Sequence, residues 1–451
     1  MKRPEILLVN PWIHDFAAYD LWARPLGLLV LATRLRRLGW EPRVVNCLDP
    51  DHPDMKPVRS RLHGHGRFHR TPIPKPDVLQ RIPRTYCRYG VSPDLVRRDL
   101  ESIPNPEAIL VTGIMTYWYP GVRETIQLLR EVFPGKPILL GGVYPSLLPD
   151  HAGSVGADDV ISGPVESVLA EILFRKTGLL SREVPPGPEF LPALDLMRKV
   201  RFLPLLTSRG CPFRCVYCAS DLISPPFVRR TPAQVVDEIR ATVDRYGISD
   251  IALYDDAFLV NAQSHALPIL ESVIDEIPGL RWHCPNGLHG SAITRKVASA
   301  MKRAGFETIR IGLESSSDEF HSRTGGKTNI RGFVAAVENL KEAGFSRKQI
   351  GVYLLVGMPG QSRTTIEADV ERVLAAGAHP KLAEYSPIPG TTMWPQALER
   401  SRYPIDTEPL FHNCTLLPVA EPDVDPEFLQ LTRKRISNVY TGSRKLCRIF
   451  S

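Results

Sequence analysis

Three cysteines lie within one short run of the chain, Ser-Arg-Gly-Cys-Pro-Phe-Arg-Cys-Val-Tyr-Cys, as Cys211, Cys215 and Cys218. Thiolates are ligands of iron–sulfur clusters and of structural zinc, and both kinds of site normally take four protein ligands. No nearby Cys-x-x-Cys or His-x-x-x-His supplies a fourth. The remaining cysteines stand singly: Cys47, Cys87, Cys284, Cys414 and Cys447. The spacing therefore predicts a four-iron cluster on three thiolates, with one iron open to another ligand.

A disulfide and a zinc knuckle are the other interpretations of this run. The N-terminus has only a four-residue apolar run before Asn10, too short for the core of a secretory signal peptide. No stretch approaches the length of a membrane span. We therefore expect a cytoplasmic protein, in which disulfides are rare, and zinc would want a fourth ligand.

With Tyr217 directly before its third cysteine, the run resembles the signature of the radical S-adenosylmethionine (SAM) enzymes. In that family the amino and carboxylate groups of SAM chelate the open iron. An electron from the cluster then cleaves SAM to a 5′-deoxyadenosyl radical. The resemblance implies a [4Fe–4S] cluster on Cys211, Cys215 and Cys218, bound SAM, and an external electron donor such as a flavodoxin or ferredoxin.

Strand and helix patterns alternate through the second half of the chain. Helix starts and stops are clear, as at Thr231-Pro232 and Gly305. Six such units fit an incomplete (β/α)6 barrel over residues 201–395, followed by a C-terminal extension, 396–451, with one helix. The predicted strands are Phe202–Thr207, Asp250–Tyr254, Leu280–Cys284, Thr308–Leu313, Ile350–Val356 and Lys381–Tyr385.

Polar residues follow several of these strands, and the carboxyl ends of barrel strands are where reactive groups gather. Asp255 and Asp256 follow the second strand. Adjacent strand residues point to opposite faces, so we expect one of the two to face the ligand. Glu314 ends the fourth strand, either as an acceptor for ligand hydrogens or as a cap of the next helix.

The family resemblance assigns these strand ends to SAM. Asp-Asp-Ala-Phe replaces the commoner Gly-Gly-Glu pattern after the second strand, which leaves the individual aspartates unassigned. The turn Gly357-Met358-Pro359-Gly360 allows close backbone approach, or is a plain turn. The implied SAM contacts are Tyr217, Asp255, Asp256, Glu314, Gly357 and Pro359.

The first half of the chain predicts a doubly wound, Rossmann-like parallel sheet over residues 1–176. A basic insertion, 51–89, carries prolines and four scattered histidines, and we interpret it as an irregular surface flap. A proline-rich linker, 177–200, leads to the barrel. The predicted strands are Glu5–Asn10, Pro42–Cys47, Ala108–Thr112, Pro137–Leu140 and Asp159–Ile161, with helices over Leu26–Leu38, Val122–Phe133 and Val165–Arg175.

This half looks like the cobalamin-binding domain of B12-dependent radical SAM proteins, on the runs Pro-Leu-Gly-Leu, Thr-Gly-Ile-Met, Gly-Gly-Val-Tyr-Pro and Gly-Pro-Val-Glu. The Asp-x-His-x-x-Gly motif, which supplies a cobalt ligand in many B12 proteins, is absent, and Tyr144 stands where related proteins often have histidine. We therefore expect cobalamin to bind without a protein histidine on cobalt. A degenerate nucleotide-type domain that binds nothing is the alternative. The implied contacts are Leu26, Gly27, Thr112, Gly113, Gly141, Gly142, Tyr144, Gly163 and Glu166.

The leading hypothesis is therefore a cobalamin-dependent radical SAM enzyme that methylates, rearranges or cyclises an unactivated carbon of a small-molecule or natural-product substrate. A tRNA methylthiotransferase is an alternative that the net charge of +7 favours, but only Cys47 and Cys87 are available for its second cluster. Most of the excess charge lies between Lys56 and Arg98 and is interpreted as an arginine-laced surface, so we expect no nucleic-acid or membrane partner. A non-catalytic iron–sulfur or zinc module is the third interpretation.

Overall fold

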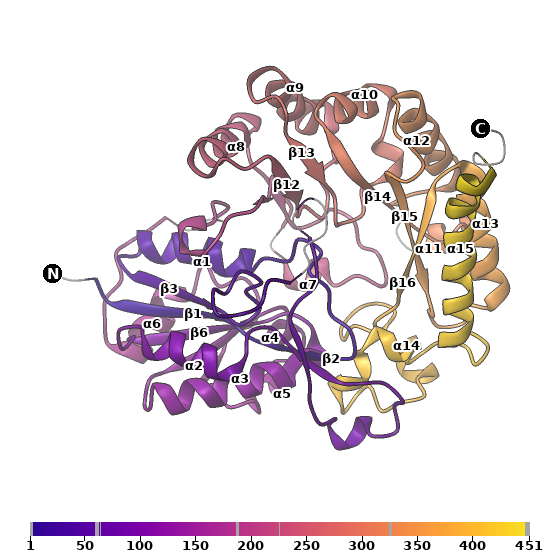
Figure 1. The fold of residues 1–451 in the computed structure, drawn as a ribbon. Coiled ribbons are helices and arrows are strands. Elements are labelled where there is room, and N and C mark those ends of the chain that lie inside the picture. The colour runs from indigo at the N-terminus through magenta and orange to yellow at the C-terminus, as the bar shows by residue number, and fades with distance from the viewer. Residues whose placement is uncertain are drawn as a thin grey trace. The chain divides into compact units, whose positions relative to one another are not determined.

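The computed structural model describes residues 3–58, 63, 65–185, 189–224, 226–323 and 327–446. Residues 186–188 of the expected linker, and Cys447, lie outside these ranges. The chain divides into two compact units, and in each of them strands alternate with helices (Figure 1), which confirms the α/β fold class. The units comprise Met1–Pro204 with Asp221–Pro225, and Leu205–Ser220 with Pro226–Ser451.

The first unit is built on a five-stranded parallel sheet with the order β3-β1-β6-β7-β8. Strand β1 is buried along its whole length, as its apolar sequence predicts. The strands are β1 (Glu5–Asn10), β3 (Glu41–Asn46), β6 (Ala108–Gly113), β7 (Ile138–Gly142) and β8 (Asp159–Val160), and the helices are α1 (Leu26–Arg37), α2 (Pro93–Glu101), α3 (Tyr119–Val132), α4 (Val143–Leu147), α5 (Pro149–Gly153) and α6 (Leu169–Thr177). The doubly wound sheet is thus confirmed. Its order is flavodoxin-like, so the ligand crevice is expected where β1 and β6 end.

Contrary to our expectation of an irregular flap, part of the insertion over 51–89 forms β-strands. Its strands β4 (Arg70–Pro72) and β5 (Cys87–Tyr89) pair antiparallel with β2 (Ile13–Asp15), in the order β2-β5-β4. Phe68 and Tyr86 are buried there. Strands of three residues are too short to show periodicity in a sequence, so the pattern could not reveal them.

The expected linker, 177–200, belongs to the first unit. Trp40 Nε1 donates to Ser181 Oγ over 3.0 Å, and Arg37 pairs with Glu189 at 2.6 Å. Ala193 joins the apolar cluster under α1. Tertiary contacts therefore hold the described part of this segment against the sheet.

A six-stranded sheet has the order β16-β15-β14-β13-β12-β9, and all of its strands lie in the second unit except β9, which begins in the first. The helices of the second unit lie along the outer side of the strands (Figure 1). Helix α8 begins with a capping box in which Thr231 Oγ1 accepts from the Gln234 amide, as the Thr-Pro start predicts. The strands are β9 (Leu203–Leu205), β12 (Asp250–Leu253), β13 (Arg281–His283), β14 (Phe306–Glu314), β15 (Ile350–Val356) and β16 (His379–Glu384); the main helices are α8 (Pro232–Tyr246), α9 (Ala266–Glu276), α10 (Arg295–Arg303), α12 (Ile330–Glu342) and α13 (Arg363–Ala376).

The C-terminal extension is part of the second unit's core. Helix α14 spans Trp394–Arg400, and α15, Pro426–Leu446, lies beside β16 (Figure 1). Val424 and Phe428 pack in one apolar cluster with Val356 of β15 and Ile366 of α13. The described part of the extension is therefore integral to the α/β unit.

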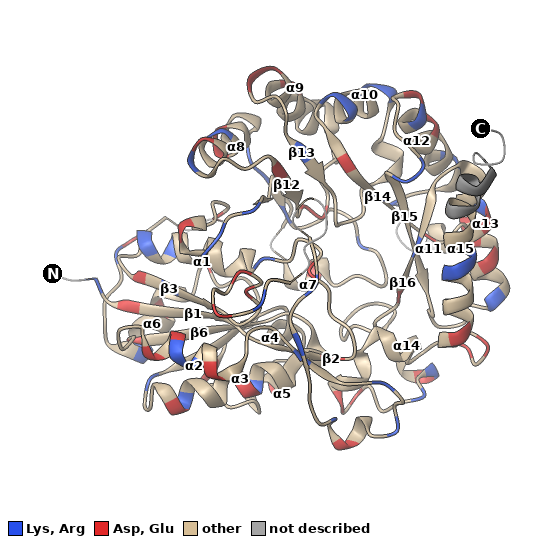
Figure 2. Ribbon diagram, viewed as in Figure 1, with Lys and Arg blue, Asp and Glu red and all other residues tan. Residues whose placement is uncertain are grey.

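Both Lys or Arg positions and Asp or Glu positions occur along the helices of the second unit (Figure 2). Arg240 of α8 pairs with Glu276 of α9, and Arg435 of α15 pairs with Glu371 of α13. The basic residues of these helices are thus interleaved with acidic partners. Among the described helices, none combines the length and the apolar character that crossing a membrane requires.

Candidate active site

The three clustered cysteines lie on a loop whose two ends are held together by a short pair of strands, β10 (Ser208–Arg209) and β11 (Val228–Arg229), which we call the neck of the loop. Strand β10, just after β9, pairs antiparallel with β11, and the cysteine loop runs between them. Gly210 turns the chain into the loop with φ +76°, a conformation that glycine adopts without strain. The loop thus leaves the carboxyl end of the first strand of the six-stranded sheet.

The three thiols are free, and their surroundings suit metal binding. Burial raises the pKa of Cys211 and of Cys215, while the positive charge of Lys327 opposes the shift. Buried thiols bind metal as thiolates, so a cation on the loop offsets the cost of deprotonation. In the described chain, the Sγ atoms of the three cysteines do not all lie within 4.8 Å of one another, as the ligand atoms of a single ion would. This donor set fits a cluster of several irons.

Tyr217 lies between the second and third cysteines, half-buried. Its ring stacks on Phe320, with centroids 6.2 Å apart and planes 8° from parallel, and its hydroxyl bonds to Cys215. Tyr217 therefore packs against α11 (Asp318–Arg323) on one side and the second thiol on the other.

Glu314 ends β14 in a left-handed conformation, φ +68°, which is rare and strained for a residue other than glycine. Burial raises the pKa of its carboxyl, and the charge of Lys327 opposes the rise. Its Oε1 lies against Gly312, where an added Cβ would stand 2.8 Å from it. The cap of α11 comes from Ser317, whose Oγ accepts from the Phe320 amide. Glu314 therefore does not supply this cap, and its role as a ligand-binding residue stays a prediction.

The two aspartates after β12 have different environments. Asp255 is 3% exposed and accepts hydrogen bonds from Thr207 Oγ1 and Ser208 Oγ, both at 2.6 Å, and from the Thr207 amide at 2.9 Å. Asp256 is exposed, and its charge raises the pKa of Cys211. Asp256 is therefore the aspartate with oxygens available beside the cysteines.

The turn after β15 is held largely by the protein itself. Gln361 Oε1 accepts from the Gly357 amide over 2.9 Å, and Gln361 Nε2 donates to the Leu355 carbonyl. An added Cβ at Gly357 would stand 3.0 Å from Leu417, and φ there is +78°. Pro359 is half-buried. Packing of the C-terminal segment alone accounts for the glycine at 357.

Sequence reasoning missed His289, which follows the third strand, β13. It is 3% exposed, its ring lies 4.5 Å from that of Phe213 in the cysteine loop, and burial lowers its pKa to about 3. Among the described residues, none hydrogen-bonds its Nε2. A single histidine without a partner at metal-ligand spacing gives no sequence signal. The sequence shows only that His289 follows the predicted third strand.

In the first unit, the residues implied for cobalamin lie at or near the carboxyl ends of the strands. Thr112 and Gly113 end β6, and the next two residues, Ile114 and Met115, are 42% and 41% exposed. Exposed apolar side chains at a switch point of a doubly wound sheet fit the face of a large, partly apolar ligand.

Two glycines of this unit are required by packing. An added Cβ at Gly142 would stand 2.6 Å from the Gly113 carbonyl oxygen, and one at Gly113 would stand 2.9 Å from the Tyr144 ring. Tyr144 is fully buried, and its hydroxyl lies 2.6 Å from His151 Nδ1. Its side chain is therefore a core group.

Other implied positions have room for a ligand. Nothing lies within 4 Å of a Cβ added at Gly27 or at Gly163, and the nearest atoms to one at Gly141 are 3.9 Å away. Leu26 is buried, and the half-buried Glu166 accepts from Arg34 Nη2 through its backbone carbonyl, at 2.6 Å. Each of these glycines therefore has open space beside it.

Comparison with known proteins matches both units. The family model of the radical SAM superfamily matches residues 205–373, and that of the B12 binding domain matches residues 85–173. Bacteriochlorophyllide d C-12(1)-methyltransferase of Chlorobaculum tepidum is 25% identical over 61% of this chain, which spans 62% of that relative, less than two thirds. Hopanoid C-3 methylase of Methylococcus capsulatus is 25% identical over 86% of this chain and 72% of its own.

A solved structure shares the fold. It is the radical S-adenosylmethionine methyltransferase TsrM from Kitasatospora setae, with tryptophan substrate and a SAM analogue bound. The TM-score is 0.64 at 19% identity, covering 88% of this chain and 76% of that one. At this identity the likeness establishes the fold.

Proposed function

We propose that this chain, which belongs to the radical SAM superfamily and carries a B12-binding domain, methylates an unactivated carbon of a small-molecule substrate. The chain is an enzyme of that superfamily, and a [4Fe–4S] cluster, SAM and cobalamin are the cofactors of its two domains. The observation that carries the proposal is the cysteine loop, with Asp256 and Glu314 at or just after the carboxyl ends of β12 and β14, the strands on either side of β13. Two methyltransferases among its relatives favour methylation over rearrangement or ring closure.

Each side chain at this site has a role in the proposal. When bound, the cluster and SAM supply a carbon-centred radical, and cobalamin supplies a methyl carrier. Cys211, Cys215 and Cys218 hold the cluster. Asp256 accepts from the SAM amino group and Glu314 from its hydroxyls, because none of the described side chains donates a hydrogen bond to either carboxylate. Burial around Tyr217 and His289 excludes water from the reacting groups.

The turn residues Gly357 and Pro359 border the SAM in this proposal through their backbone. We also propose a flavodoxin- or ferredoxin-like electron donor, since one-electron reduction of the cluster needs an external source. The free thiols of the described chain suit the cytoplasm, where we place the enzyme.

Cys215→Ala, purified without oxygen, tests the cluster assignment. We expect loss of the iron–sulfur absorbance and of 5′-deoxyadenosine formation, because two thiolates cannot hold the cluster. Cys414→Ala is the matched control, because Cys414 is a half-buried cysteine of the same unit that lies outside the cysteine loop. Unchanged iron content in Cys215→Ala would overturn the proposal.

Cobalamin is proposed to lie on Ile114 and Met115, beside the open glycines. Met115→Asp should lower the bound corrin seen in the absorbance spectrum, because it places a charge against an apolar face. Leu180→Asp is the control, since Leu180 is 85% exposed in the same unit. Tyr144→Phe should leave the corrin bound, because the Tyr144 hydroxyl is buried on His151. Equal corrin in Met115→Asp and wild type would contradict this placement.

The methylthiotransferase alternative requires a second cluster in the first unit. Cys47 and Cys87 are 0% and 3% exposed, and burial raises the pKa of both thiols. Two separate core thiols do not make such a site. The carboxylates beside the cysteine loop likewise disfavour a non-catalytic iron–sulfur or zinc module.

A further inference from the structure

The neck of the cysteine loop is fastened by a buried group of four residues, Thr207, Ser208, Asp255 and His265, which we call the Asp255 clamp. Their exposed fractions are 0%, 1%, 3% and 2%. The clamp joins the start of the loop to the end of β12 and to the residue before α9. It lies three positions before Cys211, the first cluster cysteine.

Both carboxylate oxygens of Asp255 are occupied within the clamp. Oδ1 accepts from Thr207 Oγ1 and Ser208 Oγ, and Oδ2 accepts from the Thr207 amide. Thr207 has one hydroxyl hydrogen, which it donates to Asp255, so His265 Nε2, 2.8 Å away, must donate to Thr207 Oγ1. Burial lowers the pKa of His265 to about 4, which agrees with a neutral ring protonated at Nε2. The donors run in one direction, from His265 through Thr207 to Asp255.

The second strand of the neck, β11, is held in place by a separate set of contacts. Arg230, just past β11, donates to the Leu206 carbonyl over 3.0 Å and pairs with buried Glu238 of α8. The Arg230 amide donates to the Thr207 carbonyl, also over 3.0 Å. Arg230 thus connects the two ends of the cysteine loop, while the Asp255 clamp connects the start of the loop to the six-stranded sheet.

We infer that Asp255 is a positioning residue that fixes the neck of the cysteine loop so that the three thiols are presented together, and that it does not contact SAM. Asp255 is 3% exposed and already accepts three hydrogen bonds, whereas its neighbour Asp256 is exposed and accepts none from the described residues. Hydrogen bonds that hold the residues around a metal site in place orient its ligands and support metal affinity. The inference rests on the proposed function, because it assumes that the loop holds a cluster.

The test compares Asp255→Ala with Asp256→Ala after anaerobic cluster reconstitution. Each variant is titrated with an iron chelator, and the concentration that removes half of the cluster absorbance is recorded. We expect Asp255→Ala to lose its cluster at a chelator concentration about 10- to 100-fold lower than wild type. Asp256→Ala should keep the wild-type midpoint and bind SAM more weakly, as measured by equilibrium dialysis.

Urea unfolding of the apo proteins separates positioning from folding. If Asp255→Ala does not fold, Ser208→Ala serves, because it removes one hydroxyl donor and leaves the carboxylate in place; it should lower the chelator midpoint in the same direction. A folded Asp255→Ala with the wild-type chelator midpoint and weaker SAM binding would overturn the inference and make Asp255 a SAM ligand. The proposed function would stand in that case, since it depends on cluster loss in Cys215→Ala.

Discussion

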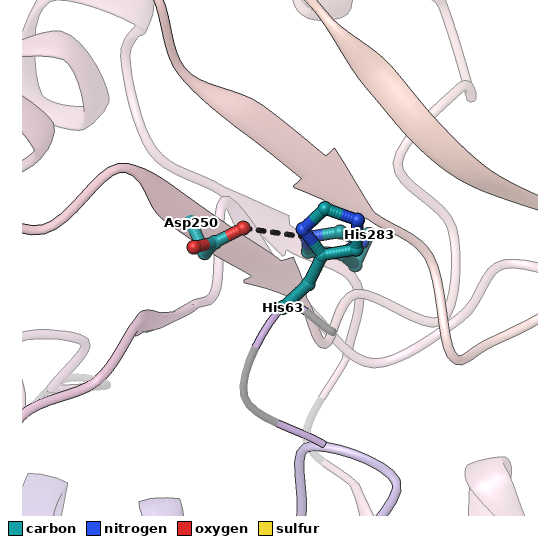
Figure 3. Close-up of side chains that lie close together, drawn as sticks. All are labelled: His63, Asp250 and His283. Carbon is teal, nitrogen blue, oxygen red and sulfur yellow. Dashed lines mark hydrogen bonds and ion pairs between the residues drawn. The ribbon is translucent and has the colours of Figure 1, made fainter. Parts of the chain in front are cut away.

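The two ends of strand β12 each carry a buried aspartate, and their partners differ in charge. Asp250 begins the strand and accepts a hydrogen bond from His283 Nε2, at 2.9 Å (Figure 3). It also accepts from Arg281, at 2.8 and 2.6 Å. Asp255, past the other end, accepts from the Thr207 and Ser208 hydroxyls and from the Thr207 amide. Asp250 thus has a cationic partner in Arg281, whereas these partners of Asp255 are neutral.

The partners decide the electrostatic cost. Burial alone would raise the pKa of Asp250, but the hydrogen bonds and charges of His283 and Arg281 outweigh it and hold that pKa well below its usual range. Burial raises the pKa of Asp255 to about 6, because the bonds from Ser208 and Thr207 oppose it only in part. The amino end therefore stabilises the fold, while the carboxyl end keeps a charge that folding does not favour. Such a charge is expected where function needs it.

Removing the carboxylate at the amino end should have the largest effect on stability. Asp250→Ala takes one acceptor from Arg281 and one from the fully buried His283, and we expect a loss of about 3 kcal/mol, the lower end of the range for breaking a buried ion pair from one side, because the Arg281 side chain is 39% exposed. Urea unfolding at neutral pH measures this loss. Asp255→Ala should cost about 1 kcal/mol, since lost hydrogen bonds are offset by removal of an unfavourable charge. Equal losses in the two variants would remove the distinction between the two ends.

The pH dependence of stability should have opposite signs at the two ends. Asp255 has a raised pKa when folded, so its contribution is fully present below the unfolded value near 3.8 and is lost as pH rises through about 6, roughly 3 kcal/mol in all. Asp250 has a lowered pKa, so its contribution is present above that unfolded value and is lost as pH falls below it.

Unfolding free energies measured from pH 3 to 7.5 give this comparison. Relative to Asp255→Asn, wild type should lose stability between pH 4 and 7. Relative to Asp250→Asn, it should lose stability only below about pH 4. A flat difference for Asp255→Asn would show that the clamp carries no uncompensated charge.

Much of the fold could be predicted because apolar strands separated by amphipathic helices leave a strong local pattern. Strand Ile350–Val356 was predicted to the residue, and Glu5–Asn10 likewise. The three-residue strands of the small antiparallel sheet have no such pattern. The path of 177–200 along α1 also depends on distant partners, such as Trp40 with Ser181.

The candidate site likewise contains some residues that the sequence reveals and others that only the fold brings together. Its cysteines are readable because their spacing is local, and two adjacent aspartates show that only one can face a ligand. Which one does so depends on Thr207, which lies 48 positions before Asp255. His289 and Lys327 enter the site through packing and charge that no spacing encodes.

The smallest predicted effect separates loss of stability from loss of loop position. Thr231→Ala removes the N-cap of α8, just beyond the neck of the cysteine loop, and should cost about 1 kcal/mol in urea unfolding. Ser208→Ala removes one hydrogen bond of the clamp and should cost about the same. If the clamp positions the thiols, only Ser208→Ala will lower the chelator concentration at which the cluster is lost. If both variants lower it equally, cluster retention follows global stability, and the two ends of β12 differ in charge but not in function.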